Sequence, residues 1–178
     1  MSQVINEGRA ALKGLRSSDS GFQNLVQSLS AVKQELALPD VVDFRLAVEG
    51  DARPLRPIIG EEVYRIGREA LVNAFRHSRA SKIELEIGYA VKHLRIVVRD
   101  NGCGIDSEVL RSGRDGHWGI RGMREKAEEI GARLKVRSRP GAGTDVELSI
   151  PGDVAFEIRP SVTRWRRLAG LSRPTRKP

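Results

Sequence analysis

The sequence is poor in several features that define whole classes of protein. Cys103 is its single cysteine, so it can form no internal disulfide, which fits a reducing compartment such as the cytoplasm. It contains no run of about 18 apolar residues, so no membrane-spanning helix is predicted. Its N-terminus lacks the apolar core of a signal peptide. These absences argue against a secreted, disulfide-rich or membrane-inserted chain.

Two common phosphate-binding motifs are also missing. The chain has neither the phosphate loop GxxxxGK[ST] nor GxGxxG after a first strand. Kinases and dehydrogenases built on those two folds are therefore excluded.

Acidic residues are absent from residues 159–178, which carry seven basic ones. Removing these seven from the net charge of +8 leaves +1 for residues 1–158. A nucleic-acid binder usually carries its basic patch on the fold itself, so no specific nucleic acid is expected. The basic end is either a weak anchor for nucleic acid, anionic lipid or a partner, or a solvated disordered terminus; we favour the terminus.

The length of 178 residues fits one domain. Apolar spacing predicts helices over 3–16, 22–38, 58–77 and 122–131, and strands over 41–50, 82–89, 93–99, 133–139 and 144–150. Short turns join the last two strand pairs, which must therefore be antiparallel. We expect an α/β (α+β) two-layer sandwich, with about five strands covered on one face by about three helices.

Residues 100–123 form the most unusual stretch, with six of the chain's 18 glycines between a predicted strand and a predicted helix. Glycines let the backbone approach a ligand closely, and a helix N-terminus presents unpaired N–H groups that suit phosphate. The stretch is therefore either a nucleotide site or a long surface turn.

The helix predicted over 58–77 carries polar residues on one face. Glu69, Asn73 and His77 are spaced four apart, and Arg76 lies beside them. An amide oxygen can bind Mg²⁺, and a guanidinium can pair with phosphate. Taken alone, this stripe is better explained as an exposed helix face.

Asp100 follows an apolar strand, where a buried carboxylate needs partners. An ionised aspartate only accepts hydrogen bonds, so it could bind an exocyclic amine of a purine base. The alternative is an aspartate that begins the Asp-Asn-Gly turn.

Four motifs that follow one another along the chain favour the nucleotide site over these alternatives. They are Glu69-x3-Asn73, Asp100-x-Gly102-x-Gly104, Gly119-Ile120-x-Gly122-Met123 and Gly143-Thr144. Together they resemble the motif set of the Bergerat-fold ATPases, a superfamily that includes DNA gyrase, MutL and the sensor histidine kinases. Three sequence segments are most similar to the ATP-binding catalytic domain of bacterial two-component sensor kinases, in the nitrate-sensing and membrane-fluidity-sensing branch. These segments are EALVNAFRHS, DNGCGI and GHWGIRGM. The resemblance covers about residues 22–151.

The resemblance implies a mixed, mostly antiparallel sheet and an ATP–Mg²⁺ site. Asp100 would bind the adenine amine with Thr144 nearby, Asn73 would ligate Mg²⁺, and Glu69 would have a supporting catalytic role. The remaining implied nucleotide-binding residues are Arg76, His77, Gly102, Gly104, Ile105, Gly119, Ile120, Gly122 and Met123. Residues 106–118 would form a short lid over ATP.

The resemblance also implies a division of the chain and a set of partners. Residues 1–17 would be a stub of the second helix of a dimerising, phosphate-accepting hairpin, 18–151 the ATP-binding domain, and 152–178 a basic, disordered tail. The parent kinase would be a homodimer that transfers the γ-phosphoryl of ATP to a histidine and then to a response regulator. We expect a cytoplasmic location, including the cytoplasmic part of a membrane-bound sensor.

Two other functions fit the same motifs. One is a stand-alone ATPase or an anti-sigma-type serine kinase of this fold. The other is a non-catalytic interaction module, although the presence of both Asp100 and Asn73 argues against it.

The chain departs from the family in its histidines. His77, His93 and His117 are all it has, and none precedes the ATP-binding motifs, where the acceptor histidine belongs. We therefore predict that the purified chain does not autophosphorylate. Incubation with γ-labelled ATP should leave no acid-labile label on the protein, and appearance of such label would contradict the prediction.

Overall fold

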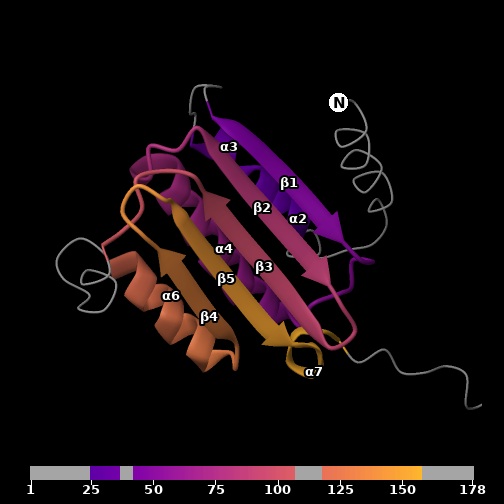
Figure 1. Ribbon diagram of the computed structural model, residues 1–178. Helices are drawn as coiled ribbons and strands as arrows, with labels where there is room; N and C mark the ends of the chain where they lie inside the picture. The colour runs from indigo at the N-terminus through magenta and orange to yellow at the C-terminus, as the bar shows by residue number, and fades with distance from the viewer. Residues whose placement is uncertain (1–24, 37–41, 107–117, 158–178) are drawn as a thin grey trace, which may run out of the picture.

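The computed structural model describes residues 25–36, 42–106 and 118–157, and the elements below lie within these ranges. Figure 1 shows a sheet of five strands with helices packed behind it. In chain order the elements are α2 (Leu25–Ser30), α3 (Val32–Glu35), β1 (Asp43–Glu49), α4 (Pro57–His77), β2 (Lys82–Tyr89), β3 (His93–Asp100), α6 (Trp118–Glu129), β4 (Arg133–Ser138), β5 (Thr144–Pro151) and α7 (Gly152–Ala155).

The sheet has the strand order β1-β2-β3-β5-β4. β1 and β2 are parallel, and the three other neighbouring pairs are antiparallel. The parallel pair follows from its connection, because α4 carries the chain back across the sheet between them. The predicted mixed, mostly antiparallel sheet is therefore confirmed, including the two antiparallel pairs that short turns join.

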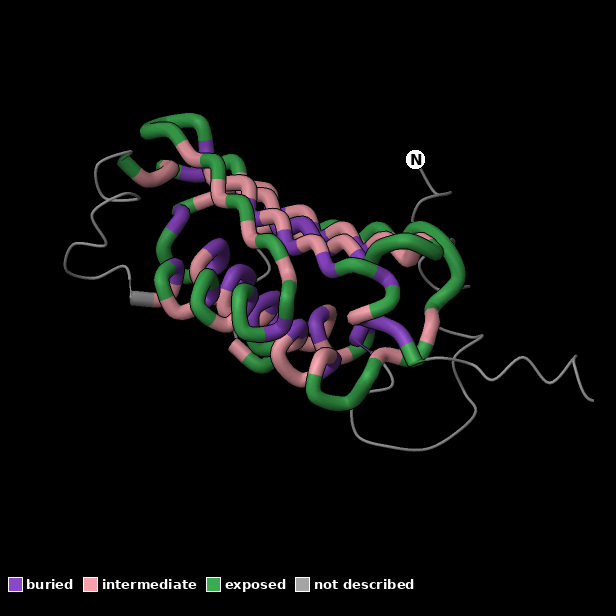
Figure 2. Tube along the Cα trace, turned by 90° about the horizontal axis from the view of Figure 1, so that it is seen from below, coloured by how far each residue is buried: buried purple, intermediate pink, exposed green. Residues whose placement is uncertain are grey.

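The helices lie on one face of the sheet, and the buried positions gather between the two layers (Figure 2). Along β2, Ile83, Leu85 and Ile87 are buried and alternate with half-buried polar residues. This period of two places one side of each strand against the helices. The two-layer sandwich expected from the sequence is thus confirmed.

α4 is the longest described helix and runs to the end of the sheet at which β3 finishes. Pro57 occupies its first turn, where a missing N–H costs nothing. At the other end Ser78 donates to the carbonyl of Ala74 at 2.5 Å and accepts from the N–H of Ala80 at 3.0 Å. This hydroxyl ends the helix and turns the chain into β2, so the last turns of α4 lie beside the end of β3.

The outer face of the sheet is covered by ion pairs instead of helices. Arg95 pairs with Glu86 and Glu147, and Arg99 also pairs with Glu86. Between these arginines Val97 points outward yet is fully buried. The aliphatic stems of long charged side chains can shield an apolar residue in this way.

α6 differs from its predicted range of 122–131, because it already includes Trp118. Gly119 therefore lies in its first turn and not in a loop before it, while Gly122 is helical as predicted. Glycine disfavours helix by about 1 kcal/mol relative to alanine, which is why the pattern alone placed the boundary later. Tertiary packing decides otherwise: Ile120 and Met123 are buried against the core at helical spacing.

The predicted helix over 22–38 is seen as α2 and α3, which a turn at Ala31 separates. The backbone bonds from Ala31 N–H to the Gln27 carbonyl and from Glu35 N–H to the Ala31 carbonyl continue the helical pattern across it. The predicted helix is therefore confirmed over its described part, with a break that the apolar spacing did not reveal.

The folded unit extends beyond Pro151, where the sequence analysis placed the start of the tail. α7 follows directly, and Phe156 is almost fully buried and bridges to Leu55. The Phe156 ring lies 4.0 Å below the guanidinium carbon of Arg53 and 6.5 Å from the ring of Tyr89. The boundary after Pro151 is therefore wrong, because an aromatic anchor holds residues 152–157 to the domain.

Several predicted segments lie outside the described residues. They are the hairpin stub over 1–17, the lid between residues 106 and 118, and the basic tail beyond Glu157. Within the described ranges, no helix combines the length and the hydropathy that crossing a bilayer requires.

The role of Phe156 can be tested by truncation of its side chain. Phe156→Ala should lower the free energy of unfolding by about 3–5 kcal/mol, because it removes a buried ring and leaves a cavity. Urea denaturation of the full chain measures this, with exposed Glu157→Ala as the neighbouring control, expected within about 0.5 kcal/mol of wild type. Equal stability of the two variants would show that residues 152–157 do not belong to the folded unit.

Candidate functional site

Three polar residues lie in one row across the end of the sheet. Strand register pairs Asp100 on β3 with Thr144 on β5, and Thr144 with Ser138 on β4. Two residues further into the sheet the same row holds Val98, Val146 and Val136, which belong to the core or pack against it. The helix-facing side of the sheet is therefore apolar along its length and becomes polar only at this end.

A cavity of about 380 Å³ lies between this polar end of the sheet, α4 and α6. Most of the predicted site residues line it, namely Glu69, Asn73, His77, Asp100, Gly104, Ile105, Gly119, Ile120, Met123 and Thr144. These residues come from segments up to 75 positions apart in the chain, so the tertiary fold alone assembles them.

Three predicted residues do not line the cavity. Arg76 is exposed beyond its edge, Gly102 is buried behind the wall, and Gly122 lies on the side of α6 where an added Cβ would meet open space. Asn73 and His77 lie on the face of α4 that borders the cavity, and α-helical spacing places Arg76 outside that face.

The sequence analysis also missed part of the wall. The unpredicted lining residues are Ala70, Ala74, Ser78, Val98, Cys103 and Val146. Strand alternation could have identified two of them, because Val98 and Val146 lie two positions from Asp100 and Thr144 on the same side of their strands. The small residues of α4 carry no such signal, since alanine is common throughout helices.

Asp100 is held by the backbone of its own loop. Its Oδ1 accepts the N–H of Gly102 at 2.9 Å, and the N–H of Thr144 also donates to the carboxyl group. Burial raises the pKa of the Asp100 carboxyl above its ordinary value, and these two backbone donors oppose the shift only in part. The result is a half-buried acceptor that is anchored on one side and borders the cavity on the other.

Glu69 and Asn73 form a second polar group, one turn apart on α4. Asn73 Nδ2 lies 3.5 Å from Glu69 Oε1, a long hydrogen bond. With Nδ2 turned toward Glu69, the carbonyl oxygen Oδ1 of Asn73 is directed elsewhere and can serve as a metal ligand. A Cβ on Gly119 would lie 2.4 Å from Glu69 Oε1, so a side chain at this position would push the carboxylate out of its present place.

The glycines of the loop after β3 also pack closely against other segments of the backbone. A Cβ on Gly102 would lie 2.1 Å from the Ser78 carbonyl oxygen, and one on Gly104 2.0 Å from that of Arg139. Gly104 also has a φ of 67°, which side chains disfavour. Both glycines therefore allow the loop to pack against other backbone. Between them, the Cys103 N–H donates to the Ser78 carbonyl oxygen at 2.7 Å.

Cys103 is a free, exposed cysteine. The flanking glycines pack inward, which leaves the intervening side chain outward at the wall of the cavity. Its thiol lies 3.6 Å from the His77 carbonyl oxygen.

The described residues contain no group of three or more His, Cys, Asp or Glu side chains that could hold a metal ion. A divalent ion at Asn73 would therefore need further ligands from phosphate and water. Mg²⁺ is commonly held in this way, by one or two protein oxygens together with phosphates and waters. The donor set thus fits Mg²⁺ that arrives with a nucleotide.

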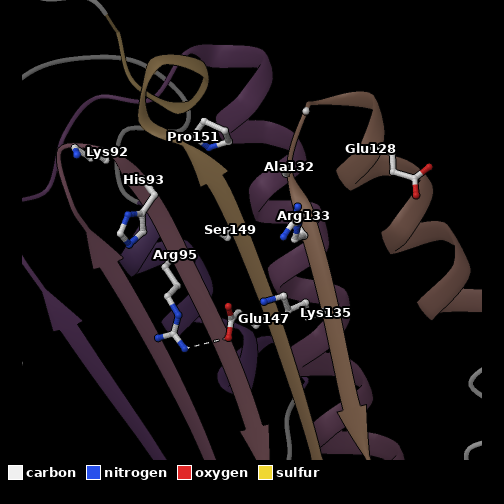
Figure 3. A pocket seen from close by; sticks show the side chains of 11 residues that line it. Lys92, His93, Arg95, Glu128, Ala132, Arg133, Lys135, Glu147, Ser149 and Pro151 are labelled. Atoms are coloured by element: carbon white, nitrogen blue, oxygen red, sulfur yellow. Dashed lines mark hydrogen bonds and ion pairs between the residues drawn. The ribbon is translucent and has the colours of Figure 1, made fainter.

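A larger hollow of about 790 Å³ lies on the opposite, outer side of the sheet (Figure 3). Side chains from β3, β4 and β5 line it, with Arg95 paired to Glu147 and with Lys92, His93 and Lys135 around them. It contains none of the predicted site residues. Volume and motif content therefore point to different hollows, since the smaller, helix-facing cavity is the one that collects the motif residues.

The fold and the cavity define a class: a two-layer α/β domain with a ligand pocket between the sheet end and two helices. The chain belongs to the family described as histidine kinase-, DNA gyrase B-, and HSP90-like ATPase, which matches residues 59–154. The resemblance inferred from the motifs is thereby confirmed.

Curated relatives include sensor kinases. The chain is 32% identical over 149 residues to the sensor histidine kinase LiaS of Bacillus subtilis, covering 84% of this chain and 40% of that protein. It is 34% identical over 162 residues to the nitrate/nitrite sensor protein NarX of Escherichia coli, covering 88% of this chain and 27% of that protein. The chain thus spans well under half the length of these relatives.

A solved structure supports the fold independently. The histidine kinase domain of a blue-light activated histidine kinase from Erythrobacter litoralis superimposes with a TM-score of 0.58 at 19% identity, covering 85% of this chain and 72% of that one. At this identity the likeness establishes the fold, and the site residues rest on the geometry described above.

The raised pKa of Asp100 predicts a stability effect. Near neutral pH the buried carboxylate is ionised at a cost, so Asp100→Asn should raise the melting temperature of the nucleotide-free chain. As the pH falls through the raised pKa, the native carboxyl becomes neutral and the advantage of the variant should shrink. Thermal unfolding across this range measures both effects, with exposed Asp153→Asn as the control. A variant less stable than wild type at neutral pH would contradict the prediction.

Proposed function

We propose that this chain is the ATP-binding catalytic domain of a sensor histidine kinase. The observation that carries the proposal is the cavity that Asp100, Asn73 and the first turns of α6 line together. Membership of the ATPase family and the sensor-kinase relatives support it from outside the structure.

The base would bind at the sheet end of the cavity. Asp100, anchored by the Gly102 N–H, would accept a hydrogen bond from the exocyclic amine of adenine. Ile105, Ile120 and Met123 line the same cavity and offer the apolar surface that a flat aromatic ring needs. A hydrogen bond at one edge and apolar contact over both faces would together suit the adenine base of ATP.

The phosphates would lie toward α4 and the start of α6. Asn73 Oδ1 would be the protein ligand of Mg²⁺, which supplies charge neutralisation of the phosphates. His77 lies one turn further along the same face, and exposed Arg76 is within one helical step of it, at the edge of the site. Glu69 is held close to both Asn73 and Gly119, which suits a supporting role in orienting these groups.

The parent protein would supply what this chain lacks. A hairpin bearing the acceptor histidine would receive the γ-phosphoryl group, and a response regulator would take it from there. Dimerisation through that hairpin and a place on the cytoplasmic side of a membrane belong to the same proposal. The basis is the partial coverage of the relatives, since this chain spans only 40% of LiaS and 27% of NarX.

Calorimetric titration of the purified chain with ATP and Mg²⁺ tests the binding step. Wild type should bind, and Asp100→Asn should weaken binding at least about tenfold, because a carboxylate acceptor is replaced by an amide that presents a donor. Asp153→Asn, on α7 and outside the cavity, should bind as wild type does. Absence of binding by folded wild type, or equal binding by Asp100→Asn, would contradict the proposal.

The same preparations distinguish a kinase domain from the two alternatives. A kinase domain should transfer label from γ-labelled ATP to a histidine on an added acceptor-hairpin fragment from a related sensor kinase. A stand-alone ATPase or serine kinase would turn over or label serine without that fragment. An interaction module would do neither.

A further inference from the structure

Ser138, the last residue of β4, joins three segments around the cavity without lining it. Its hydroxyl oxygen lies 2.8 Å from the N–H of Ile105, 2.8 Å from the carbonyl oxygen of Gly143 and 2.9 Å from Thr144 Oγ1. These partners belong to the loop after β3, the β4–β5 turn and the first residue of β5. One hydroxyl therefore ties together the loop and strands that form the base end of the cavity.

The proton of each partner can be assigned by elimination. A backbone N–H only donates, so Ser138 Oγ accepts from Ile105. A carbonyl oxygen only accepts, so Ser138 must donate its one proton to Gly143. The remaining contact then requires Thr144 to donate to Ser138. In this arrangement the Ile105 N–H and both hydroxyl protons each have an acceptor. If Ser138 donated to Thr144 instead, the Gly143 carbonyl would lose the hydroxyl that donates to it.

This assignment decides what Thr144 can offer a ligand. Its proton is committed to Ser138, so any hydrogen bond that its hydroxyl makes within the cavity must be as an acceptor. Asp100, its register partner on β3, is also an acceptor when ionised. The base end of the cavity therefore carries two neighbouring acceptors and favours a ligand edge that donates.

We propose that Ser138 is a positioning residue that makes the base pocket selective for a 6-amino purine over a 6-oxo purine. The inference rests on the proposed function, since it concerns the base of the bound nucleotide. A 6-amino group can donate a hydrogen bond to each of the two acceptors, Asp100 and Thr144. The oxygen of a 6-oxo group only accepts, so its lone pairs would face the lone pairs of Asp100 and Thr144. Sites built around such groups discriminate strongly, because a mismatch leaves buried polar atoms unpaired.

Loss of the Ser138 hydroxyl should change the selectivity of the pocket. In Ser138→Ala the Thr144 proton is released, so the threonine can rotate and donate to an oxo group. Binding of inosine triphosphate should therefore improve relative to ATP. The dissociation constant of inosine triphosphate divided by that of ATP should fall roughly tenfold. A merely structural role would weaken both nucleotides alike and leave this ratio unchanged.

The experiment is calorimetric titration of the full chain with Mg²⁺ and either nucleotide, for wild type and four variants. Ser138→Thr keeps the hydroxyl and should keep the wild-type ratio. Ser138→Cys, under reducing conditions, keeps the size but hydrogen-bonds weakly, so it should behave like Ser138→Ala and serves if the alanine variant does not fold. Ser149→Ala removes a hydroxyl from β5 at the outer hollow and should leave the ratio as in wild type.

The outcomes separate the two proposals. Wild type that binds ATP, with an unchanged ratio in Ser138→Ala and Ser138→Cys, overturns the role of Ser138 and leaves the proposed function intact. Wild type that binds neither nucleotide overturns the proposed function and this inference with it. A ratio that falls in both variants but not in Ser138→Thr or Ser149→Ala supports the assignment.

Discussion

The structure depends on a carboxylate placed at the end of a buried strand. β3 lies between β2 and β5 and is apolar on its helix-facing side until Asp100. Burial of a charged group is unfavourable, as the raised pKa of Asp100 reflects, and two backbone N–H groups offset only part of that cost. The fold thus keeps a half-buried, anchored acceptor at the wall of a cavity, which suits a ligand that donates a hydrogen bond.

The surrounding elements support this arrangement by close backbone packing. The loop after β3 contacts the end of α4 through Gly102 and the β4–β5 turn through Gly104, at distances that admit no side chain. Ser138 adds hydrogen bonds between the same loop and turn. The sheet end of the cavity is therefore built mainly from main-chain contacts, which restrict its geometry more than flexible side chains would. At the other end, Asn73 and Glu69 are linked by a long side-chain hydrogen bond.

The two faces of the sheet serve different purposes. The inner face carries the apolar core and the motif residues, whereas the outer face is covered by arginine–carboxylate pairs that run across β2, β3 and β5. Exposed ion pairs contribute little stability individually, yet here they shield Val97 and leave no apolar strip on β3. This covering keeps the wide outer face of β3 from offering an apolar surface to other sheets.

The sequence by itself determined the sheet, the long helix and the motif residues, because strand alternation, helical spacing and local spacings such as Glu69 to Asn73 are short-range properties. It did not show that α6 includes Gly119, that Phe156 anchors the chain beyond Pro151, or that Gly102 packs on Ser78. Those facts depend on contacts between distant segments, and long-range packing overrides local propensity at element ends. Tertiary structure alone decided that Asp100, Thr144 and Ser138 lie side by side, because only strand register brings them together.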